Sequence, residues 1–461
     1  MRTASLTNVA NREIVAIFMM LGAGFVAFWL HPRIGMTPNM VLFYIMSLGL
    51  AFVHPKLALI LYVIILTFTL ERPDRPFDFL RFDEIFLGAI ILATLPRITV
   101  RRFGIPQSKT LLILIVSYFF YLLFSFISLL QGNVGFKDLF SLGKDSIKLL
   151  LFFLGLYYVV NRRDVTIFVV ATFIIGLIVA IIGALQYLNF WKTVELINQH
   201  YPKITSGAPV FSLSNPRASS VLGNPNICAI FLSLHACILF SILLSRKRLG
   251  GKDAFIIAAL TLDIVIIFLT RSRTGVLVVG IGLGILTIYK QHFKMTALIM
   301  LIGTVIYFAL PQRTFARWQN LHLDLQDRIQ VETRAWGYSA TNLPLGGGPT
   351  YRAPVWVEST YGWILSQRGV IGLFFFFLIV GSVIILLWKS HKYRIGIVHP
   401  LSLGMLAWFL SLFPAAFTGD YFFANKMAEI FWLLLGVVVA TSKPQFNWMQ
   451  KAHTSRHRME H

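Results

Sequence analysis

Apolar runs of about 20 residues recur from residue 15 to residue 441, separated by short polar connections. A helix of this length crosses the hydrocarbon core of a bilayer, which is about 30 Å thick. Only the segment from about residue 311 to residue 360 lacks such a run. The pattern therefore predicts an all-α polytopic membrane protein with about 12–14 transmembrane helices and one large loop.

We expect spans near 15–31, 40–53, 57–70, 85–96, 110–131, 147–160, 165–187, 223–244, 254–270, 274–289, 295–310, 361–388, 398–418 and 423–441. The spans at 40–53 and 57–70 are short for a bilayer, so one bent hairpin is the alternative there. These spans divide the chain into a transmembrane bundle (1–310), a large loop (311–360), C-terminal spans (361–441) and a basic tail (442–461).

Composition agrees with this class, because 57% of the residues are hydrophobic and only 13% are charged. The net charge of +22 would suit nucleic acid, but the basic residues gather in every second connection between spans. They are Arg97 to Arg102, Arg162 with Arg163, Arg246 to Arg248, Lys290 with Lys294, and Lys389 to Arg394. By the positive-inside rule these connections are cytoplasmic. We therefore expect both termini in the cytoplasm, membrane lipids as surroundings, and no nucleic-acid partner.

This topology places five segments on the outer face: 71–84, 132–146, 188–222, the turn at 270–275, and 311–360. The turn contains Arg271 and Arg273, and arginine on the outer side runs against the usual charge bias. Asn224 and Pro225 form a helix start, an N-cap followed by proline, and Arg217 lies just before it. Interfacial snorkelling is the alternative role for Arg271 and Arg273, and an ordinary loop charge is the alternative for Arg217.

Arginine dominates the outer segments, and the large loop contains no lysine. Guanidinium groups bind phosphate oxygens in pairs, so this bias favours anion recognition. The outer side has no Asp-x-Asp pair and the chain has no His-Glu-x-x-His motif. We therefore expect arginines, and no metal or other cofactor, to neutralise the anion. Arg334 is a further candidate ligand, with pairing to Glu332 or Asp327 as the alternative.

The acid Glu358 precedes a predicted helix of 28 residues, longer than a bilayer requires. We expect the polar first part of this helix, with Gln367 and Arg368, to lie above the lipid. Glu358 is a candidate general base at headgroup level, and a carboxylate that merely stabilises a helix start is the alternative. Asp263, near the middle of a span, indicates a function or a buried partner that the sequence does not identify.

Glycines around this helix have ordinary structural explanations. Gly369 and Gly372 are typical of close helix packing. Gly346 to Gly348 could hold a phosphate through backbone amides, but a flexible loop is the simpler interpretation.

Several short motifs, taken in order, resemble those of the bacterial O-antigen ligase and Wzy-type polysaccharide polymerase superfamily. They are Arg217 with Asn226, the 270–275 turn, Arg334 to Trp336, Pro344 to Gly348, Glu358 with Ser359, and Gly369 with Gly372. The resemblance covers roughly residues 210–385 in detail. It implies a bacterial inner-membrane glycosyltransferase that takes an oligosaccharide from an undecaprenyl diphosphate carrier at the periplasmic face.

In the ligases of this superfamily a histidine occupies the position where this chain has Glu358. The resemblance thus favours a polymerase of O-antigen, capsule or exopolysaccharide repeats over a ligase that transfers glycan to lipid A-core or another acceptor. It implies Glu358, Arg271 and Arg273 as catalytic residues, and Arg217 and Arg334 as ligands of the carrier diphosphate. The partners would be the lipid-linked oligosaccharide and a glycan or lipid acceptor.

Two hypotheses from other classes stay open. About 12–14 spans also suit a secondary transporter or a lipid-linked oligosaccharide flippase, but such proteins usually have repeated halves and polar groups at the bilayer midplane. This chain has no convincing repeat, and its polar groups concentrate on one face. A non-catalytic assembly or binding scaffold would also account for the arginine turn alone.

Overall fold

The computed structural model describes residues 46–68, 82–100, 108–130, 136–195, 217–246, 250–292, 344–347, 359–393, 396–423 and 425–442, with isolated positions between 297 and 337. The predicted span 15–31, most of 295–310 and most of the large loop lie outside these residues. Glu358 and nearly all of the basic tail also lie outside them.

All regular structure in the described residues is helical, as the apolar pattern predicts. Among the described residues, six helices are long and apolar enough to cross a membrane: α5 (Lys109–Leu130), α7 (Arg162–Tyr187), α9 (Pro225–Leu244), α11 (Arg273–Lys290), α15 (Thr360–Tyr393) and α16 (Val398–Ala415). The described residues also include α3 (Pro55–Phe68), α4 (Phe82–Val100), α6 (Phe136–Tyr158), α10 (Gly251–Leu269) and α17 (Asn425–Ala440). The fold class of a multi-pass all-α protein is thus confirmed.

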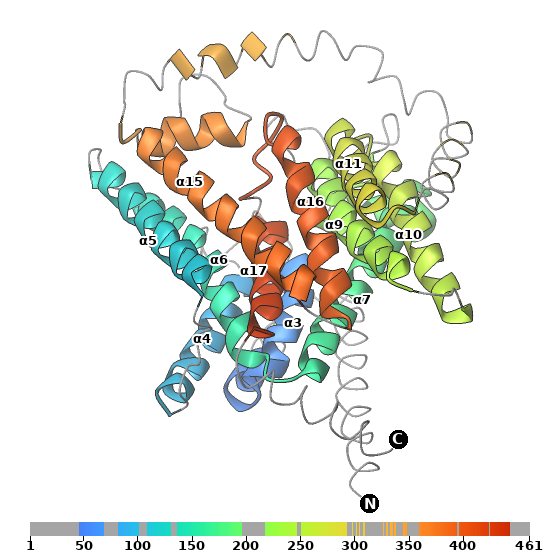
Figure 1. The fold of residues 1–461 in the computed structure, drawn as a ribbon, viewed down its shortest axis with the longest axis horizontal. Coiled ribbons are helices and arrows are strands. Elements are labelled where there is room, and N and C mark those ends of the chain that lie inside the picture. The colour runs from blue at the N-terminus through green and yellow to red at the C-terminus, as the bar shows by residue number, and fades with distance from the viewer. Residues whose placement is uncertain are drawn as a thin grey trace, which may run out of the picture. The chain divides into compact units, whose positions relative to one another are not determined.

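The chain divides after Phe103 into two compact units. In the first, α3 packs against α4. The second contains the remaining helices, among which α5 packs along α15 and α6 along α17. Helix α9 packs against α10, α11 and α16, and α16 also packs against α15 (Figure 1).

Short local signals start several helices of the second unit. The side chain of Asn224 accepts hydrogen bonds from the backbone N–H groups of Asn226 and Ile227, and Pro225 follows at the first helical position, which confirms the predicted start of α9. Asn161 and Asp164 form a capping box at α7. Ser272 caps α11 through the backbone N–H of Gly275.

The ends of the helices of the second unit collect at two opposite ends of the bundle. One end, called the outer end here, is where α7, α10 and α16 finish and α9, α11 and α15 begin. The hydrogen bonds from Ala218 N to Leu269 O and from Thr360 N to Ala416 O join segments there. At the opposite end Lys290 Nζ lies 2.9 Å from His399 Nε2, and Lys389 donates to Thr110.

Helix α15 is interrupted near its start, whereas the sequence predicted one continuous helix. Gly369 has φ 63° and ψ −168°, outside the helical region. A Cβ on Gly369 would lie 1.9 Å from the carbonyl oxygen of Pro344, so only glycine fits there. The side chain of Arg368 is only 1% exposed and lies within the bundle, and the expected position of this part of the helix above the lipid stays a prediction.

Candidate functional site

Arg217 is held between two helices at the outer end. Its Nε donates to the backbone oxygen of Thr270 at 3.0 Å, and its Nη2 donates to Oδ1 of Asn226 at 3.1 Å. Thr270 follows the last residue of α10, and Asn226 lies in the first turn of α9. The structure therefore brings Arg217, from before α9, against the turn that contains Arg271 and Arg273.

The turn of residues 270–275, called the arginine turn here, joins α10 to α11 with three residues between the two helices. Arg271 adopts a left-handed backbone with φ 54°, which is uncommon for a residue with a side chain, and it is only 6% exposed. Arg273 is the first residue of α11 and is half-buried. Observed strain of this kind is more frequent at functional sites than elsewhere, which motivates a functional hypothesis for the turn.

A second loop, residues 416–424 between α16 and α17, touches both the arginine turn and the start of α15. The hydroxyl oxygens of Thr418 and Thr274 are 2.9 Å apart. Thr360 donates its backbone N–H to Ala416 and its hydroxyl to the backbone oxygen of Gly419, at 2.8 and 2.9 Å. The first residues of α11 and α15 therefore meet at one loop.

The other two predicted site residues are placed differently. Arg334 is exposed, and its near neighbour Glu332 accepts hydrogen bonds from the backbone N–H and hydroxyl of Ser359. This part of the large loop is thus bound to the start of α15. Glu358 lies outside the described residues, so its role stays a prediction.

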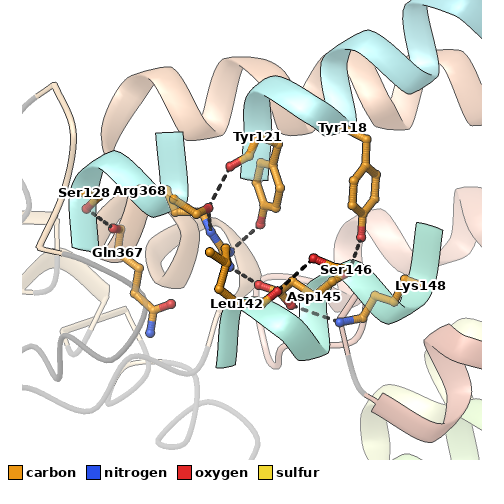
Figure 2. Close-up of polar contacts among 10 residues, drawn as sticks. Tyr118, Tyr121, Ser128, Leu142, Asp145, Ser146, Lys148, Gln367 and Arg368 are labelled. Carbon is orange, nitrogen blue, oxygen red and sulfur yellow. Dashed lines mark hydrogen bonds and ion pairs between the residues drawn. The ribbon is translucent and has the colours of Figure 1, made fainter. Parts of the chain in front are cut away.

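A buried charged cluster, absent from the site residues expected from the sequence, surrounds Arg368 in the first part of α15 (Figure 2). Arg368 donates from Nε to Ser125 Oγ at 2.6 Å, and its other nitrogens bind Tyr121 and Asp145. Lys148 Nζ lies 3.0 Å from the same Asp145. This Arg368 cluster joins α5, α6 and α15 in the interior of the second unit.

Aromatic rings complete the surroundings of Arg368. Its Cζ lies 4.5 Å from the ring centroid of Tyr121 and 4.6 Å from that of Trp363. A guanidinium between two such rings gains cation–π attraction where water is excluded. An arginine inside a predicted span is a sequence signal of a function or of a specific partner, and Arg368 within the predicted span 361–388 carries this signal.

Asp420, in the 416–424 loop, lies within electrostatic reach of the Arg368 cluster. Burial raises the pKa of its carboxyl to about 6, although the positive charges of Lys148 and Arg368 oppose this change. Its Oδ1 is buried and has no hydrogen-bond partner among the described residues. The loop that touches the arginine turn therefore contains a carboxylate that changes charge near neutral pH.

The segment that contains Gly346 and Gly347 packs against the first part of α15 at the outer end. The backbone N–H of Gly347 donates to Ser366 O at 2.8 Å, and the hydroxyl of Ser128 donates to Gln367 O at 3.0 Å. A Cβ on Gly346 would come within 2.5 Å of the backbone nitrogen of Arg368. The interpretation of this glycine run as a flexible loop is therefore wrong at Gly346 and Gly347, which pack against the interruption in α15.

No group of three or more potential metal ligands occurs among the described residues. No family model matches the sequence, and no curated protein matches it. A chain from a solved structure described as "Structural coordination of polymerization and crosslinking by a peptidoglycan synthase complex" aligns with this protein at 18% identity. The alignment covers 72% of this chain and 97% of that chain, with a TM-score of 0.43.

Proposed function

We propose that this protein is an inner-membrane glycosyltransferase of the Wzy polymerase type, acting at the periplasmic face on oligosaccharide linked to undecaprenyl diphosphate. The observation that carries the proposal is the hydrogen bond from Arg217 to the backbone oxygen of Thr270 in the arginine turn. Three arginines from two separate segments, Arg217, Arg271 and Arg273, thereby belong to the same end of the bundle. Such a group suits a diphosphate, whose charge grows as it departs.

The orientation is supported by the distribution of charge between the two ends. Basic residues of the described connections, Lys109, Arg162, Lys290 and Lys389, lie at the end opposite to the arginine turn. Basic residues favour the cytoplasmic side, which supports the proposal of a periplasmic arginine turn and cytoplasmic termini.

The proposed reaction is a direct displacement at the anomeric carbon of the lipid-linked sugar. An acceptor hydroxyl oxygen forms the new bond to that carbon while the bond to the diphosphate oxygen breaks, and the electron pair leaves with the diphosphate. Glu358 takes the hydroxyl proton as general base. Arg271, Arg273 and Arg217 neutralise the leaving diphosphate, and Arg334 is proposed to contact it from the large loop.

Contacts of the residues next to Glu358 support its inclusion. Ser359 is bound to Glu332, and Thr360 is bound to the 416–424 loop, which also touches Thr274 of the arginine turn. The chain that follows Glu358 is therefore one loop away from the proposed diphosphate ligands.

The test is extension of lipid-linked repeats by the purified protein in proteoliposomes, with no other acceptor present. Arg271→Ala should lower the rate by about 100-fold or more, the usual loss for one preorganised charge-stabilising donor. Glu358→Gln should lose activity to a similar degree. Arg162→Ala, at the opposite end and exposed, is the matched control and should extend glycan at the normal rate.

Normal extension by a membrane-inserted Arg271→Ala protein would contradict the proposal. Transfer of glycan to a lipid acceptor without any lengthening would identify a ligase instead. Movement of the lipid-linked oligosaccharide across the membrane without any acceptor would identify a flippase.

A further inference from the structure

A histidine and an aspartate meet in the interior of the second unit, between α9 and α10. His235 Nδ1 and Asp263 Oδ2 are 2.7 Å apart, and the two residues are 2% and 0% exposed. Both lie near the middle of their helices, where a carboxylate without a donor is costly. The structure thus identifies the partner of Asp263 that the sequence alone left unknown.

Helix α7 leaves room for this pair. A Cβ on Gly176 would come within 2.4 Å of the His235 ring, so the ring lies directly against the α7 backbone. Thr172 and Phe173 of α7 and Leu401 of α16 line the surrounding space with His235, and none of them is charged. Of the described titratable groups, Cys228 on α9 also interacts electrostatically with Asp263.

The same two helices hold Arg217 at their outer ends. Asn226 lies nine residues before His235 on α9, about 13 Å along the helix, and Thr270 lies seven residues after Asp263, about 10 Å beyond it. Apolar contacts between α9 and α10 are non-directional and tolerate a shift of one helix along the other. A hydrogen bond at 2.7 Å does not tolerate it, because its geometry is narrow.

We propose that the His235–Asp263 pair is a positioning pair for Arg217. It sets the axial register of α9 against α10, so that Asn226 Oδ1 and the Thr270 carbonyl both meet the guanidinium of Arg217. The inference rests on the proposed function for the identity of the anion. The claim about how Arg217 is held can be tested without any substrate.

The substrate-free test is the rate at which phenylglyoxal modifies Arg217, measured by peptide mass spectrometry with Arg162 as internal reference. Asp263→Leu removes the acceptor and should raise the rate by about tenfold, within the range of coupling between distant sites. Asp263→Asn leaves an amide oxygen that accepts from Nδ1–H, and it should restore the slow rate. A rate in Asp263→Leu equal to that of the unaltered protein would overturn the proposal.

Two further variants separate positioning from loss of folding. The double variant His235→Leu, Asp263→Leu replaces a buried polar pair by apolar side chains, which usually preserves stability. It should melt near the normal temperature and still expose Arg217. Ser233→Ala removes the hydrogen bond between Ser233 and Trp408, which joins α9 to α16 instead of α10, and should leave the Arg217 rate unchanged.

Glycan extension supplies the link to function. Asp263→Leu should lower extension of lipid-linked repeats by about tenfold, and Asp263→Asn should recover it. If the unaltered protein extends no glycan but Arg217 reactivity changes as expected, the proposed function fails and the positioning role holds. If extension proceeds normally in Asp263→Leu with Arg217 still protected, the positioning role fails alone.

Discussion

The hydroxyl oxygens of Thr274 and Thr418 lie 2.9 Å apart, which joins the arginine turn to the loop that contains Asp420. The same loop receives the start of α15 through Thr360. Residues from three distant parts of the chain thus border one region at the outer end. Its charged groups are the guanidinium groups of Arg217, Arg271 and Arg273 and the carboxylate of Asp420. Substitutions of these residues test the role of the region.

Replacement of Arg217 by lysine tests whether its planar group matters. Arg217 donates to Thr270 and Asn226 from two different nitrogens, and a single ammonium group cannot reproduce this fork. Arg217→Lys should therefore lower the rate of repeat extension by about tenfold or more, which is most of the loss expected for Arg217→Ala. Its melting temperature should change little. The measurement is repeat extension in proteoliposomes beside a thermal melt. Full activity in the lysine variant would show that charge alone is sufficient.

The pH dependence of stability should report on Asp420. Its pKa of about 6 in the folded protein exceeds the value of about 4 in an unfolded chain, so the folded state binds this proton more tightly. Stability from this group is present below about pH 4 and is lost as pH rises to about 6. Asp420→Asn does not titrate and should escape this loss.

Thermal melts in detergent from about pH 4 to about pH 8 measure this effect. The melting temperature of Asp420→Asn relative to the unaltered protein should rise up to about pH 6 and stay level above it. Parallel curves over the whole range would show that Asp420 is not buried in this way.

Removal of Arg368 should destabilise the bundle strongly. The side chain is 1% exposed and binds Ser125, Tyr121 and Asp145, so Arg368→Met leaves a buried carboxylate with Lys148 as its remaining cation. Breaking a buried pair of this kind costs about 3 kcal/mol or more. Thermal melts should show a large decrease, whereas the exposed Arg162→Ala control should melt normally. An unchanged melt for Arg368→Met would exclude a structural role for the cluster.

Alanine at Gly369 should disrupt the interruption in α15. The residue has φ 63°, and an added Cβ would meet the carbonyl oxygen of Pro344 at 1.9 Å, where no flexible side chain can move aside. Left-handed strain alone costs about 1–3 kcal/mol, and the clash adds to it. Gly381→Ala, in the same helix with open space at its Cβ position, is the matched control. Equal melting temperatures of the two variants would contradict the observed packing.

Local signals in the sequence were enough for the fold class and for several helix boundaries. The span expected at 223–244 is observed at Pro225–Leu244, and that expected at 274–289 is observed at Arg273–Lys290. Both depend on residues within one or two turns, such as Asn224 with Pro225, and on the length of an apolar run. The spacing of arginines also indicated the outer end as the place to search for a site.

Only the tertiary structure determined which charged residues meet. Arg368 and Tyr121 are 247 residues apart in sequence, Arg217 and Thr270 are 53 apart, and His235 and Asp263 belong to different helices. Apolar runs specify that helices form, but each helix can rotate and shift against its neighbours until polar groups and close-packed glycines select one register. The partners of buried charges therefore depend on the packing of the whole bundle, which no local pattern contains.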